Sequence, residues 1–294
     1  MYKKIIMKSI NELKSLNFKI DGFEIYDIYS EEEINNLSVD FYNRVLLQAY
    51  KIGLINDFNF KNYGEIVDPK ELDSLVIDVN SKNKRSLDFA VQELRECPAF
   101  TALINKKFLK KSSEVLDCPE SLLKIHIDGI LINIPSNKQR LYRFHSEQHY
   151  YPFRRNFFNF WMPVVRNKTV NNGAMIVKHK GHNKSYQFNE YSGFNKVEGY
   201  EANEENFFYQ LEIPSVEIDE FESMTTDIEV GKCLFFNSNL PHTSKINDSE
   251  EVSYSVIMRV YDYRKDLTLS DRTGIKSYQA SGGGYPDIKP VTKI

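Results

Sequence analysis

The segment from Phe144 to Pro152, FHSEQHYYP, contains residue types that bind transition metals. His145 and Glu147 are two positions apart, and on a β-strand such residues point to the same face. Side by side, the imidazole and the carboxylate supply two ligands of a two-histidine, one-carboxylate facial triad. This ligand set suits ferrous iron and leaves three neighbouring coordination positions for a co-substrate and O2.

The third ligand of such a triad has to come from a distant strand, and His242 is the best candidate. It closely follows the apolar stretch 232–237, which reads as a strand whose end delivers the histidine to a cavity. An ordinary surface histidine is the alternative interpretation. His126 and Asp128 also form a His-x-Asp pair, but the Gln-x-Tyr-Tyr-Pro continuation is missing there. We therefore expect them on a neighbouring strand and not at the metal.

A basic residue stands out in the last predicted strand, 253–262. Strand alternation places Ser253, Ser255, Ile257 and Arg259 on one face. A guanidinium in an apolar strand requires an anionic partner, because a buried unpaired charge is very costly. A ligand carboxylate bound bidentately meets that requirement. An internal salt bridge to an Asp or Glu side chain is the alternative.

Other polar residues near the motif are candidates for substrate contact. His149 shares a face with His145 if the strand continues, which favours a role beside the ligands or at the substrate. Tyr151 and Arg154 follow closely, and Arg154 and Arg155 can bind an anionic group or remain solvated. We expect His149, Tyr151 and Arg154 to contact the substrate.

Five short motifs in a fixed order resemble the phytanoyl-CoA dioxygenase-like branch of the iron(II)/2-oxoglutarate oxygenases. The resemblance covers roughly residues 120–263, and the order is far more specific than any single motif. The matching segments are His145 to Pro152, Phe160-Trp-Met-Pro163, Asn172-Gly-Ala-Met175, Gly181-His182, and Gly231 to His242. The family fold is a double-stranded β-helix, or jelly roll.

The resemblance implies a set of site residues. It makes His145, Glu147 and His242 the iron ligands, and Trp161, Ser244 and a basic residue on the next strand the 2-oxoglutarate contacts. Most members have Asp at the position of Glu147, and some relatives tolerate glutamate there. The arginine of the family falls where Ser253 aligns, whereas this strand carries Arg259 further along on the same face. We expect Arg259 to hold the C5 carboxylate of 2-oxoglutarate.

The activity that the resemblance implies is that of an iron(II)/2-oxoglutarate-dependent dioxygenase. Such an enzyme converts 2-oxoglutarate and O2 to succinate and CO2. We expect hydroxylation of an unactivated C–H bond of a small polar metabolite, because Glu147 is retained where halogenases of the family have a small residue. A redox-silent, cupin-like metal-dependent isomerase or epimerase, or a non-catalytic binding module on the same fold, are the alternatives.

The elements that position these residues change character along the chain. Residues 1–119 read as a helical region, with helices predicted from the Ser30–Glu33 capping box to Gly53, over 85–96 and over 98–111. Residues 120–265 read as the β core. Its predicted strands cover 122–134, 141–148, 157–165, 174–178, 232–237 and 253–262. The predicted fold is mainly β with flanking helices around a jelly-roll core, in one overall domain.

Two further segments are irregular. Within the insertion 183–230, residues 197–231 hold eleven acidic residues and no Lys or Arg, interleaved with aromatic residues. This insertion is either a lid over the site or a solvated excursion between strands. The tail 266–294 lacks apolar periodicity, and we expect it to be mobile.

Composition limits the protein class. The 294 residues are 41% hydrophobic and 27% charged, with a net charge of −3, which is typical of a globular chain and gives no reason to expect nucleic acid as a partner. No apolar run is long enough for a membrane span or a signal peptide. Three cysteines without a CxxC pair fit a reducing compartment. We predict a cytoplasmic enzyme with a small-molecule substrate, whose oligomeric state the sequence leaves open.

Overall fold

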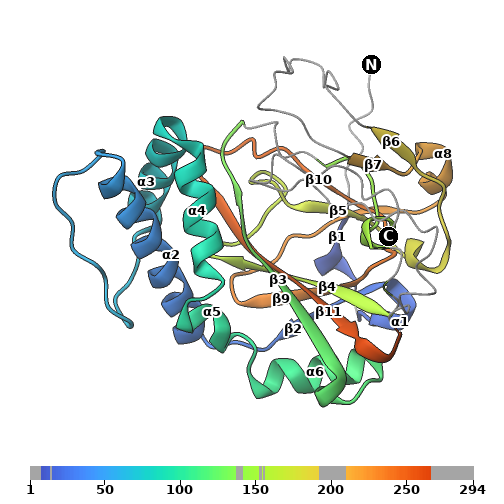
Figure 1. Cartoon of the computed structure of the whole chain (residues 1–294). Helices are drawn as coiled ribbons and strands as arrows, with labels where there is room; N and C mark the ends of the chain where they lie inside the picture. The colour runs from blue at the N-terminus through green and yellow to red at the C-terminus, as the bar shows by residue number, and fades with distance from the viewer. Residues whose placement is uncertain are drawn as a thin grey trace, which may run out of the picture.

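Two β-sheets face each other, and helices cover the outer side of the larger sheet (Figure 1). The computed structural model describes residues 8–13, 15–136, 142–151, 154, 156–191 and 210–265. Apolar side chains from both sheets pack between them, among them Phe23, Trp161, Val177 and Leu234. The prediction of a mainly β, jelly-roll fold with flanking helices is therefore confirmed.

The strands of the larger sheet are all antiparallel to their neighbours. In spatial order they are β2 (Phe23–Asp27), β9 (Lys232–Asn237), β4 (Phe157–Val164), β11 (Ser253–Asp262) and β3 (Leu123–Asn133). The smaller sheet has the order β1 (Lys8–Ser9), β8 (Ser223–Thr225), β5 (Met175–Lys178) and β10 (His242–Ser244). A separate pair is formed by β6 (Asn189–Tyr191) and β7 (Gln210–Glu212).

Strand alternation sorts the side chains of the larger sheet into two environments. The buried side chains that face the helices are apolar and belong to one large cluster, which includes Phe158 and Phe160 on β4 and Tyr254, Val256, Met258 and Val260 on β11. The opposite face of β11 carries Ser253, Ser255, Ile257 and Arg259, as predicted. Polar residues on that face lie between the sheets, where a ligand would have to bind.

The helices between residues 31 and 116 form the outer layer over the larger sheet, and the shorter ones lie elsewhere in the fold (Figure 1). In chain order the helices are α1 (Phe18–Asp21), α2 (Glu31–Lys51), α3 (Pro69–Lys82), α4 (Lys84–Leu94), α5 (Pro98–Ala102), α6 (Lys106–Leu116), α7 (Glu147–Tyr150) and α8 (Ser215–Ile218). The predicted capping box of Ser30 and Glu33 is present at the start of α2. The single helix predicted over 98–111 is wrong: α5 ends early, and Asn105 caps a new helix by accepting from the amide of Phe108.

The strand predicted over 141–148 is also wrong in the part that the structure describes. His145 forms only an isolated bridge with His242, and Glu147 begins the short helix α7. The amide of Tyr151 donates to the carbonyl of Glu147, which closes a helical turn where strand alternation was expected. The two side chains therefore meet for a different reason than the one predicted.

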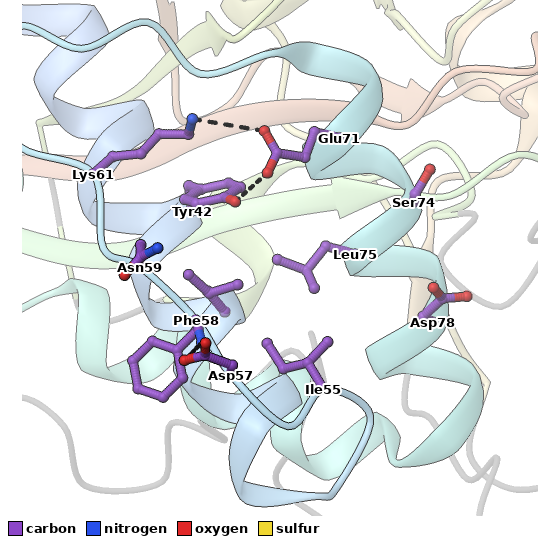
Figure 2. Close-up of a pocket in the computed structure, with 11 residues that line it drawn as sticks. Tyr42, Ile55, Asp57, Phe58, Asn59, Lys61, Glu71, Ser74, Leu75 and Asp78 are labelled. Atoms are coloured by element: carbon purple, nitrogen blue, oxygen red, sulfur yellow. Dashed lines mark hydrogen bonds and ion pairs between the residues drawn. The ribbon is translucent and has the colours of Figure 1, made fainter.

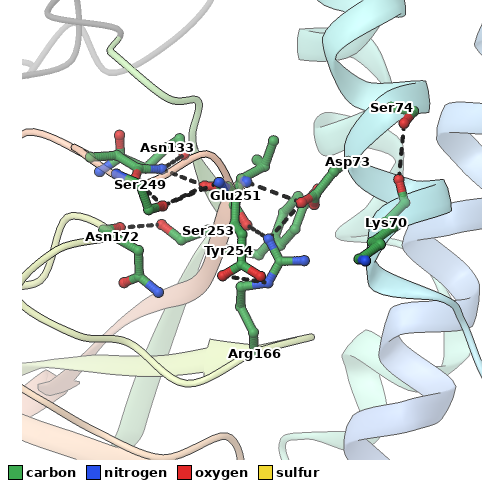
Figure 3. A network of polar contacts seen from close by, with 12 residues as sticks. Lys70, Asp73, Ser74, Asn133, Arg166, Asn172, Ser249, Glu251, Ser253 and Tyr254 are labelled. Carbon is green, nitrogen blue, oxygen red and sulfur yellow. Dashed lines mark hydrogen bonds and ion pairs between the residues drawn. The ribbon is translucent and has the colours of Figure 1, made fainter.

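Helix α3 is joined to the end of β11 by a buried polar network (Figure 3). Asp73 on α3 accepts from Nη1 of Arg166 at 2.6 Å, from the hydroxyl of Tyr254 at 2.7 Å and from the amide of Val252 at 3.2 Å. Because these donors satisfy both carboxylate oxygens, the charge of Asp73 can be buried. This network fixes the segment that follows β4 against the helical layer.

A hollow of about 580 Å³ lies in the helical layer, between α2, α3 and the segment that links them (Figure 2). Tyr42 and Glu71 hydrogen-bond across it, and Lys61 lies 3.6 Å from Glu71. None of the predicted site residues lines this hollow. Among the helices of the described ranges, none has the length and apolar character needed to cross a bilayer.

Candidate metal centre

The imidazoles of His145 and His242 and the carboxylate of Glu147 converge on one point. One ligand atom from each lies within 4.8 Å of the others, and all three residues are buried. Nε2 of His145 is 3.9 Å from Oε1 of Glu147, and Nε2 of His242 is 4.0 Å from the same oxygen. The structure thus brings together the three residues that the sequence selected.

The backbone explains how residues so distant in sequence meet. His145 and His242 exchange two backbone hydrogen bonds, of 3.0 and 2.9 Å, so the motif segment pairs with β10 at this position. Glu147 follows at the start of α7, and the amide of Gln148 donates to the carbonyl of Ser238 at 2.9 Å. The turn of α7 directs the carboxylate towards both rings.

Second hydrogen bonds fix the tautomer of both histidines. Nδ1 of His145 lies 2.7 Å from the carbonyl of Arg143, and Nδ1 of His242 lies 2.9 Å from the carbonyl of Leu240. A carbonyl only accepts, so both Nδ1 atoms carry the proton. The lone pairs on Nε2 consequently face Glu147, which is the arrangement found in metal-binding histidines.

Burial keeps both imidazoles neutral. It lowers the pKa of His145 to about 3, with the nearby His242 as a second cause, and it lowers the pKa of His242 to about 4. Since only a neutral imidazole binds a metal, both rings are ready for coordination at neutral pH. Two neutral nitrogens and one anionic oxygen match the donor set of the facial triad.

Arg259 holds the other carboxylate oxygen of Glu147. Its Nε donates to Oε2 at 3.0 Å, its Nη2 forms an ion pair with the same oxygen at 2.9 Å, and its Nη1 bonds Asp128. Burial opposes the charge of Arg259, but Asp128 and Glu147 raise its pKa well above the ordinary value. The salt bridge that the sequence left open as an alternative is therefore present. Whether Arg259 also contacts 2-oxoglutarate stays a prediction.

Asp128 reaches Arg259 because β3 carries a bulge. Along β11, Ile257 pairs with Gly129 and Met258 pairs with Ile127, so Asp128 has no partner in the ladder. Its carboxylate also lies 3.5 Å from Nε2 of His126. His126 and Asp128 are thus on a strand next to the site, outside the triad, as predicted.

The remaining predicted cofactor contacts lie on the inner surfaces of the two sheets. Trp161 on β4 is buried in the apolar cluster between the sheets. Ser244 is two residues beyond His242 on β10 and pairs with Met175. Both positions are compatible with contact to a ligand between the sheets, and their roles stay predictions.

The three predicted substrate residues lie on or directly beyond α7. Nδ1 of His149 is 3.3 Å from Oγ of Ser146, and its ring lies 4.5 Å from that of Phe188. Arg154 and Arg259 lie over the ring of Tyr151, with Cζ at 4.8 and 5.0 Å from its centroid. Two guanidinium groups thus lie against one aromatic ring, and one of them, that of Arg259, contacts the triad at Glu147. Arg155 lies outside the described residues.

The predicted insertion contacts the motif segment at both of its described ends. Ile213 donates to the carbonyl of Phe144 at 2.7 Å, and the amide of Leu211 donates to the hydroxyl of Tyr150 at 3.0 Å. Phe188, at the other end, packs on His149. Residues 192–209, the middle of the insertion, and the tail 266–294 lie outside the described residues, so the lid stays a prediction.

Sequence reasoning missed two polar residues between the sheets, Lys168 and Asn159, and predicted the face of a third, Ser255. Lys168 is buried and bonds Oγ of Ser253, while Asn159 and Ser255 have buried polar side-chain atoms without a partner among the described residues. Asn159 follows strand alternation and was open to prediction. Lys168 lies in the irregular stretch between β4 and β5, where no period indicates the direction of a side chain.

The comparison with family models decides the relationship. The phytanoyl-CoA dioxygenase (PhyH) model matches residues 47–253, from within α2 to the start of β11. The chain belongs to the phytanoyl-CoA dioxygenase family. The resemblance inferred from the five motifs is thereby confirmed, and the chain is a member of a family of iron(II)/2-oxoglutarate-dependent oxygenases. No curated protein sequence matches this chain.

Three solved structures illustrate what this chain is similar to. EvdO2 from Micromonospora carbonacea var. aurantiaca has a TM-score of 0.51 and 16% identity, over 83% of this chain and 88% of that one. EctD from S. alaskensis, with bound Fe, has a TM-score of 0.49 and 13% identity, over 85% and 76%. SnoN, an alpha-ketoglutarate-dependent epimerase from nogalamycin biosynthesis, has a TM-score of 0.45 and 12% identity, over 83% and 79%. At these identities the likeness concerns the fold alone.

Proposed function

We propose that this protein is an iron(II)- and 2-oxoglutarate-dependent dioxygenase that hydroxylates an unactivated C–H bond of a small polar metabolite. The observation that carries the proposal is the convergence of two neutral Nε2 atoms and one carboxylate oxygen in a buried site. Membership of the phytanoyl-CoA dioxygenase family supports the same chemistry.

In this proposal His145, His242 and Glu147 hold ferrous iron. The carbonyls of Arg143 and Leu240 keep the two rings oriented, and Arg259 engages Oε2 of Glu147. Only Oε1 is then directed at the metal, so the carboxylate binds through one oxygen and leaves coordination positions for the co-substrate and O2. When bound, iron and 2-oxoglutarate supply the oxidising chemistry, which yields succinate, CO2 and an oxidised substrate carbon.

The substrate would bind beside α7. His149, Tyr151 and Arg154 supply an imidazole, a phenol and a guanidinium there, a set that suits a polar molecule of modest size. Burial lowers the pKa of His149 to about 4, so at neutral pH this ring offers hydrogen bonds without charge. Retention of Glu147 supports hydroxylation over halogenation, because its carboxylate fills the position that a halide would need.

The proposal is tested by succinate release. Protein reconstituted anaerobically with ferrous iron is exposed to air with 2-oxoglutarate, and succinate is measured with and without candidate substrates. We expect iron-dependent succinate formation that His242→Ala abolishes. Succinate formation that continues in His242→Ala would contradict the proposal, as would its absence in iron-loaded protein given a panel of polar metabolites. The latter result would favour the redox-silent isomerase or the binding module.

A matched control separates loss of the metal from general damage. His126→Ala removes a histidine on β3 that approaches Asp128 but does not belong to the triad. We expect this variant to form succinate at a rate within about twofold of the wild type, as usual for a partly exposed substitution.

A further inference from the structure

We propose that the ammonium of Lys168 binds the C5 carboxylate of 2-oxoglutarate, the contact that the resemblance assigns to Arg259. The inference rests on the proposed function and names a cofactor-binding residue for it. It starts from a buried lysine that lacks a counter-ion among the described residues.

Lys168 is an unusual residue to find in this position. It is only 2% exposed, and the one hydrogen bond of its ammonium to a described residue goes to Oγ of Ser253. No carboxylate among the described residues lies within ion-pair distance of it. Burial alone lowers its pKa to about 7, since no neighbouring charge contributes. A buried ammonium without an anion is costly, which is expected where a ligand supplies the anion.

The backbone holds Lys168 in place. Its amide donates to the carbonyl of Ile228 at 2.8 Å, and the amide of Ile228 donates back at 3.0 Å. Ser253 donates its own hydroxyl proton to the carbonyl of Asn172 at 2.7 Å (Figure 3), so its oxygen is free to accept from Lys168. The ammonium therefore has two further N–H groups for a ligand.

The inner face of β11 supplies a polar surface that leads from the triad towards Lys168. Ser255 lies between Ile257 and Ser253 on that face, and its buried hydroxyl has no partner among the described residues. Both side-chain polar atoms of Asn159, on the neighbouring strand β4, are likewise buried and unpaired within that part of the chain. The side-chain amide of Asn159 and the hydroxyl of Ser255 can each donate to a bound dicarboxylate, which offers only acceptors.

Arg259 lies too close to the triad to hold the far end of 2-oxoglutarate. A metal–oxygen bond, the carbon chain and a charge-assisted hydrogen bond together span about 10 Å. Arg259 touches Glu147 directly, which places its guanidinium about 5 Å from a metal bound there. Its charge is also already matched by Glu147 and Asp128, whereas Lys168 has no such match.

The test compares two ligands that differ in the C5 carboxylate. Binding of 2-oxoglutarate and of 2-oxobutanoate, which lacks that group, is measured by titration calorimetry on full-length protein loaded with Mn(II). We expect Lys168→Met to lower the affinity for 2-oxoglutarate by about 30- to 300-fold, in line with loss of a buried charge pair. The affinity for 2-oxobutanoate should change by less than about threefold. Lys168→Arg should keep most of the preference.

Two variants serve as controls. Lys178→Met removes another buried lysine, whose ammonium bonds the carbonyl of Phe221, and should leave the preference unchanged. Arg259→Met should lower the affinity for both ligands alike, because it weakens binding of the metal that both ligands contact. A preference that survives in Lys168→Met, or that disappears only in Arg259→Met, overturns the assignment of Lys168 while the proposed function stands. Wild-type protein that binds neither ligand with Mn(II) present overturns both.

Discussion

Arg259 holds Glu147 by its outer carboxylate oxygen, with Nε and Nη2 at 3.0 and 2.9 Å from Oε2, while Oε1 faces both histidines. The guanidinium thus fixes which oxygen is available to a metal. Asp128, placed by the bulge in β3, bonds the same guanidinium from the other side. This chain of three charged side chains positions the one anionic ligand of the site.

Removal of this guanidinium should therefore weaken metal binding. In Arg259→Met, Glu147 loses the hydrogen bond and the ion pair that orient it. We expect iron affinity to fall by about 10- to 100-fold, as usual for a group that orients a metal ligand. Competition with a chelator under anaerobic conditions measures this change. Unchanged affinity would show that Glu147 does not depend on Arg259 for its orientation.

The stability of the protein without ligands should increase when Lys168 is made apolar. Burial lowers the pKa of Lys168 from 10.5 to about 7, so the unfolded chain binds more protons than the folded chain between these values. Wild-type stability should thus rise with pH across this window. The free energy of unfolding of Lys168→Met should exceed that of the wild type most at pH 7 and below. The difference there should reach a few kcal/mol, at about 1.4 kcal/mol per pKa unit. It should vanish above pH 10.5, where the lysine is neutral in both states.

Urea unfolding at several pH values measures that difference. Lys178→Met, tested in parallel, is the matched control for a buried lysine that has a carbonyl partner. A Lys168→Met protein less stable than the wild type at pH 7 would show that the lysine contributes to folding, and not only to ligand binding.

Binding of 2-oxoglutarate should depend on pH through the same lysine. A bound carboxylate favours the charged ammonium, so binding takes up a proton when the free lysine is neutral. The dissociation constant should therefore rise above pH 7, by up to about tenfold per pH unit for a single coupled proton. Lys168→Arg, which stays charged, should show little change up to pH 9. Equal pH profiles for the two proteins would contradict the linkage.

The Asp73 network should matter for stability. In Asp73→Ala, the half-buried Arg166 loses its carboxylate partner at 2.6 Å and, among the described carboxylates, keeps only Glu251 at 3.9 Å. The buried hydroxyl of Tyr254 loses its acceptor as well. We expect a loss of about 3 kcal/mol in the free energy of unfolding. Asp78→Ala removes an exposed carboxylate from the same helix and should change stability by less than about 0.5 kcal/mol. Similar losses in the two variants would mean that the network contributes little.

Much of the fold followed from local patterns. Strands β9 and β11 begin and end where apolar periodicity predicted, and α2 begins at its capping box. Asp68 and Pro69 are good start signals for α3, but its polar composition hid the apolar stripe. The break between α5 and α6 depends on one capping side chain, Asn105, inside a stretch that otherwise reads as continuous helix.

The candidate site was predicted in part, and one step was wrong. His145 and Glu147 were selected by a strand rule, whereas a helical turn after His145 directs the carboxylate. The groups still meet because sequence proximity and a distant pairing with His242 bring them together. The partners of Arg259 and the position of Lys168 depend on a bulge and an irregular segment, and neither follows from a periodic pattern.

Anaerobic titration with ferrous iron tests the central claim most directly. The claim predicts about one iron per chain in the wild type and in His126→Ala, and affinity lower by at least about 100-fold in both His145→Ala and His242→Ala, because each removes one of only three protein ligands. Iron binding of wild-type strength in either of the last two variants, or its loss in His126→Ala alone, would contradict the account.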